Sequence, residues 1–133
     1  MNWTPNAIRD IWQWIDATHI GSLWQAANGT NAITTSGQMV KRASDCVTSG
    51  TNHLTEATNG PTYQATALQG KGCLRFTTAA SSQLTSASNF GTDANTQFTQ
   101  YVVYQSSMAT NGFFWGVNST TTPFMFFWRI QSS

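Results

Sequence analysis

Residues 59–76 read NGPTYQATALQGKGCLRF and predict a β-hairpin near the middle of the chain, which indicates the fold class. The hairpin is entered through the turn sequence Asn59-Gly60-Pro61. Here we expect glycine to supply unusual backbone angles and proline to fix its own φ and extend the residue before it. Residues 62–66 then have a β-favouring start and no helical period, which predicts the first strand.

The second half of the hairpin begins with Gly-Lys-Gly at residues 70–72, which predicts a turn. Residues 73–76 follow, and their side chains alternate between apolar and polar, as in a strand with one buried face. Leu74 and Phe76 are therefore expected in the core, and Arg75 is expected in solvent.

Other short strands are expected on both sides of this hairpin. In residues 38–43 we expect Met39 and Val40 on opposite faces, and residues 98–105 are the densest in β-branched and aromatic side chains. Short helical pieces are expected at residues 5–9 and 22–25. The remaining predicted strands are residues 11–17, 53–58, 83–85, 112–118 and 124–131. Many short strands separated by turn signals predict an all-β sandwich or barrel.

The composition limits both the fold and the partners. The chain has 133 residues, of which 40% are hydrophobic and only 8% are charged, against roughly 25% charged in an average protein. This predicts one folded domain with an uncharged polar surface. The net charge is +1 and no basic stripe is present, so nucleic-acid binding is not expected. No membrane span and no signal peptide are expected either, because no apolar run is long enough and the N-terminus lacks a charged start.

Two cysteines, Cys46 and Cys73, are expected to be free thiols, although a disulfide between them is an alternative. They do not form a Cys-x-x-Cys motif, and the aspartates do not form the runs typical of calcium loops, although Asp45 with loop carbonyls is a weak calcium candidate. We therefore expect no cofactor and no metal. The two histidines, His19 and His53, are expected in loops without partners, and Asp16 is expected to accept hydrogen bonds from turn amides.

Several segments, in order, resemble one known group of proteins. They are WTP at residues 3–5, WIDA at 14–17, TEAT at 55–58, PTY at 61–63 and QGKGCLRF at 69–76. Together they resemble the concanavalin A-like (LamG-like) jelly-roll domains of tailed-bacteriophage virion proteins, over residues 3–105. The pattern departs from that group where Lys41-Arg42-Ala43 replaces an expected tryptophan and Thr77-Thr78 replaces an expected Asp-Gly.

The resemblance implies an all-β, concanavalin A-like jelly-roll sandwich formed by residues 1–133 as one domain. Domains of this group are usually longer, so the sandwich is either incomplete, as the N-terminal part of a longer domain, or completed by neighbouring chains. Related glucanases carry paired glutamates, whereas this chain has only Glu56 and no two acidic residues at strand spacing, so we expect a protein without enzymatic activity.

The function expected from this resemblance is that of a structural protein of the virion, a capsid decoration or tail component. It would act by association with copies of itself and with other virion proteins. The alternative is a lectin-like module that binds a host cell-surface glycan during attachment. The contact residues proposed for either role are Trp115, Asn118, Phe126 and Trp128, although tryptophans also commonly fill the core of a β-sandwich.

Overall fold

The structure is a computed structural model. It describes residues 11, 13–47, 50–77, 81–86 and 102–103, together with the backbone of residues 112–116 and 127–130. The chain divides into two compact units, Met1–Ser88 and Asn89–Ser133. Within the described ranges the regular structure is antiparallel β-sheet with one short turn of 3-10 helix, η2 (Ile20–Ser22), which confirms the all-β class. None of the described segments forms a helix long and apolar enough to cross a membrane. The single domain expected over residues 1–133 stays a prediction.

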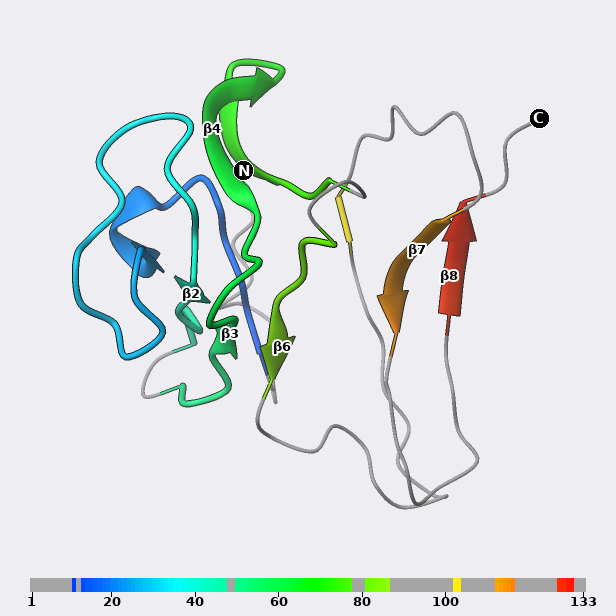
Figure 1. The fold of residues 1–133 in the computed structure, drawn as a ribbon, viewed down its shortest axis with the longest axis horizontal. Helices are drawn as coiled ribbons and strands as arrows, with labels where there is room; N and C mark the ends of the chain where they lie inside the picture. Colours follow the sequence, from blue (N-terminus) through cyan, green and yellow to red (C-terminus); the bar gives the residue numbers. More distant parts are fainter. Residues whose placement is uncertain are drawn as a thin grey trace. The chain divides into compact units, whose positions relative to one another are not determined.

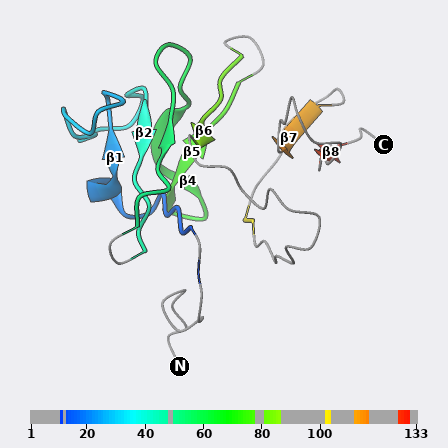
Figure 2. The ribbon, with the colours of Figure 1, turned by 90° about the horizontal axis from the view of Figure 1, so that it is seen from below.

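The first unit contains a narrow four-stranded sheet with the order β1-β2-β3-β6 (Figures 1 and 2). Its strands are all antiparallel and each has two residues. They are β1 (Leu23–Trp24), β2 (Arg42–Ala43), β3 (Leu54–Thr55) and β6 (Thr85–Ser86). Three of these strands lie within or next to the predicted ones, but each is shorter than predicted because loop hydrogen bonds replace the ladder at its ends.

The predicted hairpin is present as β4 (Thr62–Leu68) and β5 (Lys71–Arg75). Leu68 pairs with Lys71, so the connecting loop is Gln69–Gly70, and both of its residues have positive φ, 50° and 78°. Two positive φ values in a two-residue loop match the twist of the flanking strands. The turn predicted at residues 70–72 therefore lies one residue earlier.

The remaining glycine of that predicted turn, Gly72, is a strand residue for a packing reason. A Cβ atom at Gly72 would lie 2.8 Å from the Tyr63 hydroxyl oxygen and 2.9 Å from the Ala17 carbonyl oxygen. Because real Cβ atoms essentially never approach so closely, only glycine allows Tyr63 and the backbone at Ala17 to pack against β5.

The entry to β4 also depends on a close approach. Gly60 does not have a positive φ, so the expectation that it supplies unusual backbone angles is wrong. A Cβ atom at Gly60 would instead collide with the Val40 carbonyl oxygen. This proximity lets the Val40 amide donate to the Pro61 carbonyl (2.7 Å) and the Tyr63 amide donate to the Gln38 carbonyl (2.9 Å). The segment 37–40 is thereby held beside the start of β4.

The core of the first unit lies where these elements meet. Its buried hydrophobic residues are Leu23, Ile33, Val40, Ala43 and Tyr63, and the partly buried residues Ile15, Ile20, Leu54, Leu74 and Leu84 pack against them. Val40 is fully buried while Met39 is 39% exposed, which confirms the opposite faces predicted for them.

The facing predicted for β5 is correct at two positions and wrong at one. Leu74 packs against the core and Arg75 is exposed, as expected. Phe76 is 47% exposed, contrary to the prediction. The reason is that the ladder with β4 ends at Arg75, so the period-two alternation does not extend to Phe76.

Two other predicted elements differ from the structure. Among residues 11–17, those described form no ladder and are fixed by individual hydrogen bonds. The helical turn expected at residues 22–25 occurs earlier, as η2, and Leu23–Trp24 is strand β1 instead. The helix expected at residues 5–9 lies outside the described residues. Of residues 98–105, only Val102 and Val103 are described, and neither is in a strand.

The second unit contains a two-stranded antiparallel sheet made of β7 (Gly112–Gly116) and β8 (Phe127–Ile130). Both strands fall inside predicted ones. Their register shifts between Phe113 and Trp115, and Trp115 is paired with Trp128. The described part of the chain gives β8 no strand partner besides β7.

The Gly60 contact can be tested by adding one methyl group. We expect Gly60→Ala to lower the free energy of unfolding by about 2–3 kcal/mol, as overpacking at a rigid backbone does. The matched control is Gly21→Ala, because a Cβ atom there would meet only the His19 ring at 3.4 Å, and we expect it to change the stability by less than about 1 kcal/mol. Urea denaturation of both variants measures this, and equal stabilities would contradict the packing role of Gly60.

Candidate functional site

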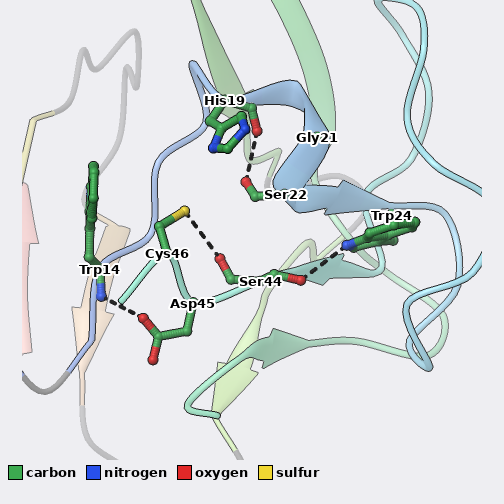
Figure 3. A pocket seen from close by; sticks show the side chains of 8 residues that line it. All are labelled: Trp14, His19, Gly21, Ser22, Trp24, Ser44, Asp45 and Cys46. Atoms are coloured by element: carbon green, nitrogen blue, oxygen red, sulfur yellow. Dashed lines mark hydrogen bonds between the residues drawn. The ribbon is translucent and has the colours of Figure 1, made fainter. Parts of the chain in front are cut away.

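The first unit contains an open pocket with a volume of about 450 Å³ (Figure 3). This volume falls in the range of small-molecule sites, roughly 300–1,000 Å³. Figure 3 shows Trp14 and Trp24 at opposite ends of the pocket, with His19, Cys46 and Ser44 between them. The residues that line it are Trp14, His19, Gly21, Ser22, Trp24, Ser44, Asp45 and Cys46.

Local hydrogen bonds in η2 and β1 shape one side of this pocket. The Ser22 amide and hydroxyl both donate to the His19 carbonyl oxygen, at 2.9 and 2.8 Å. The Ser44 amide donates to the Ser22 carbonyl and the Lys41 amide donates to the Trp24 carbonyl, each at 2.8 Å. These bonds hold η2 and β1 against the chain that enters and leaves β2.

The hydroxyl group of Ser44 lies at the centre of the polar contacts. Its oxygen accepts hydrogen bonds from the Trp24 indole Nε1 (3.0 Å) and from the Arg42 Nε (3.2 Å). The first bond fixes the plane of the Trp24 ring. The second comes from a cation, and hydrogen bonds from ionised donors are about twice as strong as neutral ones.

Asp45 is a buried carboxylate, only 8% exposed, that holds the other side of the pocket. Its Oδ1 accepts from the Trp14 amide (3.0 Å) and the Val47 amide (3.1 Å), and its Oδ2 accepts from the Asn52 amide (3.3 Å). The Cys46 amide donates to the Trp14 carbonyl (2.7 Å). Asp45 therefore fixes the backbone of Trp14, and its role as a weak calcium ligand stays a prediction.

The side chain of His53 contacts the backbone of Asp45. Its Nδ1 atom accepts a hydrogen bond from the Asp45 amide (3.0 Å), so the ring is neutral at this nitrogen. Burial lowers the pKa of His53 below its usual 6.5, the nearby Arg42 guanidinium lowers it further, and the Asp45 carboxylate partly opposes both effects. The expectation that His53 has no partner is wrong, because a histidine in a loop can reach a backbone amide that is distant in the sequence.

The contact residues predicted from the sequence lie in the second unit. The structure brings two of them together, since Trp115 and Trp128 occupy one register position of the β7–β8 sheet. Asn118 and Phe126 lie outside the described residues. No motif in the sequence pointed to Trp14, Trp24 and Ser44 as a group.

The other predicted polar residues behave mostly as expected. The Asp16 carboxylate accepts from the Thr18 amide (2.9 Å), which is the turn role predicted for it. His19 is exposed, as expected for a loop residue. Cys46 and Cys73 are both free thiols, which agrees with the first of the two readings. Within the described residues, no group of three or more metal-ligating side chains is assembled.

Comparison of the chain with known proteins gives no match among protein-family models, curated proteins or solved structures.

The contact between His53 and Asp45 predicts how stability depends on pH. Because the pKa of His53 is lowered on folding, the unfolded chain binds a proton more readily than the folded protein. The stabilisation is therefore complete above about pH 6.5 and is lost as the pH falls below that value. Urea denaturation at pH 7.5 and pH 5.5 should show a lower midpoint at pH 5.5.

The control variant is His53→Asn, whose amide oxygen keeps an acceptor in place of Nδ1 but cannot take up a proton. We expect a smaller difference between the two pH values in this variant than in the original protein. An equal difference would assign the pH dependence to another group.

Proposed function

We propose that this protein is a structural component of a bacteriophage virion, a jelly-roll module without enzymatic activity that works by protein–protein association. The order of motifs from residue 3 to residue 105 supports the virion setting and the concanavalin A-like topology. The antiparallel sheets of the described residues agree with that class of fold, although the topology of a complete sandwich belongs to the proposal.

The observation that carries the association is the exposure of Val102 and Val103, which are 41% and 85% exposed. They belong to the sequence YVVY at residues 101–104, which has the composition of a buried strand. Both valines therefore leave apolar side-chain surface exposed to solvent. Surfaces of this kind are typical of sites that contact another protein.

The charge and the second unit support the same proposal. Only 8% of the residues are charged, so little electrostatic repulsion opposes the approach of two copies. The β7–β8 sheet has two strands, and an isolated two-stranded sheet is at best marginally stable in water. Strand pairing or packing with a second copy would stabilise it. We propose copies of this chain as the first partner and other virion proteins as the second.

Analytical ultracentrifugation over a range of concentrations tests this association. We expect the protein to form oligomers, and Val103→Asp to weaken self-association by about tenfold or more, because a buried unpaired charge is costly. The control is Thr66→Asp, which adds the same charge at an exposed position of β4 and should leave association unchanged. A monomer at every concentration, or a Val103→Asp variant that assembles normally, would contradict the proposal.

A second candidate function is binding of a host cell-surface glycan through the β7–β8 sheet. The specific observation in its favour is the pairing of Trp115 with Trp128 in the strand register. Residues directly opposite each other in an antiparallel pair lie on the same face of the sheet. Two tryptophans on one face are suited to stacking against the apolar face of a sugar ring.

This candidate is tested by screening the protein on an array of bacterial surface glycans. Any glycan bound through this face should lose affinity by about tenfold or more in Trp115→Ala and in Trp128→Ala, because tryptophans dominate the energy of such contacts. The control is Lys71→Ala, at an exposed position of β5 in the first unit, which should keep its binding. Binding that survives both tryptophan changes would rule out this face.

A further inference from the structure

We propose that the pocket between Trp14 and Trp24 is a separate binding site for one neutral, hydroxyl-rich ring, such as the terminal hexose of a glycan. This inference goes beyond the association proposed above, and it uses no residue of the β7–β8 sheet. It is carried by the unused hydrogen-bonding capacity of the pocket, the arrangement of its two indoles and the absence of free charge on its lining.

The first observation is a hydrogen-bond donor without an acceptor. The Ser44 oxygen already accepts from the Trp24 indole and from Arg42, so its own hydrogen must be donated elsewhere. The side chain of Ser44 makes no other hydrogen bond within the described residues. Two incoming N–H groups, one of them cationic, polarise the hydroxyl and strengthen it as a donor. Ser44 is partly exposed in the open pocket, so this hydrogen can be donated to water or, in its place, to an oxygen of a bound ligand.

The pocket also presents acceptor capacity. The Ser22 hydroxyl donates to the His19 carbonyl (2.8 Å) and, more weakly, to the Asp16 carbonyl (3.3 Å), which leaves the lone pairs of its oxygen for a ligand hydroxyl. The His19 ring is exposed and makes no hydrogen bond with the described residues, so it offers one donor and one acceptor when neutral. A sugar hydroxyl is both a donor and an acceptor, and it can satisfy each of these groups.

The apolar surfaces lie at the ends of the pocket. Figure 3 shows the Trp14 and Trp24 rings at opposite ends, on either side of these polar groups. The Trp24 ring is held by its bond to Ser44, and the backbone of Trp14 is fixed by its bonds to Asp45 and Cys46. A fixed ring loses little conformational entropy when a ligand stacks on it.

The charges around the pocket favour a neutral ligand. No lysine or arginine lines it, and the Asp45 carboxylate is turned toward the Trp14 backbone (Figure 3). Its oxygens already accept from the amides of Trp14, Val47 and Asn52. A cationic ligand would lose its hydration without a free carboxylate on the lining, and an anionic ligand would lose its hydration with only Arg42 nearby, whose Nε already donates to Ser44. A neutral hexose avoids both costs.

The test uses the whole chain and a defined set of probes. These are the methyl glycosides of glucose, galactose, mannose and N-acetylglucosamine, with methyl glucuronide as the anionic analogue. Binding is measured by saturation-transfer NMR and by quenching of tryptophan fluorescence. We expect at least one neutral glycoside to bind, and methyl glucuronide to bind at least about tenfold more weakly.

Ser44→Ala should weaken binding of that glycoside by about tenfold, since it removes the donor. It also removes the acceptor of the Trp24 indole, so His19→Ala provides a second variant at an exposed position, and it should weaken binding severalfold. Lys71→Ala is the control that should bind normally, and circular dichroism confirms the fold of each variant.

The outcomes separate this inference from the glycan candidate for the β7–β8 sheet. Binding that is weakened by Ser44→Ala and His19→Ala but kept in Trp115→Ala supports the pocket. Binding that is lost in Trp115→Ala and kept in both pocket variants overturns this inference and leaves the other candidate standing. Absence of binding by every neutral glycoside, or equal binding of methyl glucuronide, also overturns it.

Discussion

The buried carboxylate of Asp45 is the interaction on which most of the first unit depends. A charge that is withdrawn from water is tolerated only when hydrogen bonds replace its hydration. Asp45 obtains them from the amides of Trp14, Val47 and Asn52, which belong to segments separated by more than thirty residues in sequence. Residues 13–16 have no strand partner among the described residues, so this carboxylate and a few backbone bonds give that segment its position. The indole of Trp14 is placed at its end of the pocket as a result.

The same carboxylate explains a glycine that no turn requires. A Cβ atom at Gly50 would collide with the Asp45 side chain, so the loop can close over the carboxylate only when that position has no side chain. In the same way, a Cβ atom at Gly60 would collide with the Val40 carbonyl, and a Cβ atom at Gly72 would collide with the Tyr63 hydroxyl. In this small core, glycine is used for close approach at least as much as for backbone angles, and the molecule packs its short strands tightly in consequence.

The sequence allowed prediction of the β class, of the β4–β5 hairpin and of the faces of Met39, Val40 and Leu74, because these depend on local alternation of side chains. It did not allow prediction of features that depend on distant partners. Residues 11–17 alternate like a strand, yet the described ones are fixed by single bonds to a loop. The exposure of Phe76 follows from where the ladder ends, and alternation alone does not reveal that point.

The pocket was beyond prediction for the same reason. Trp24 and Ser44 lie twenty residues apart, and only the pairing of β1 with β2 brings the indole to the hydroxyl. Tryptophans at strand positions normally indicate core, and serine carries no signal of its own in a chain so rich in hydroxyl residues. The density of aromatic residues in the sequence was enough to single out Trp115 and Trp128 as candidate contact residues. That they lie opposite each other could be known only from the register of the two strands.

The turn at Gln69–Gly70 makes the β4–β5 hairpin a natural place to carry foreign sequence. Both of its residues are exposed, and a Cβ atom at Gly70 would meet nothing within 4 Å. Exposed loop tips are the positions where proteins best accept insertions, and each doubling of loop length costs only about 0.6 kcal/mol in closure entropy. A peptide inserted between these two residues would begin and end at exposed positions. If copies of the chain cover a particle, that peptide would be displayed on it at high density.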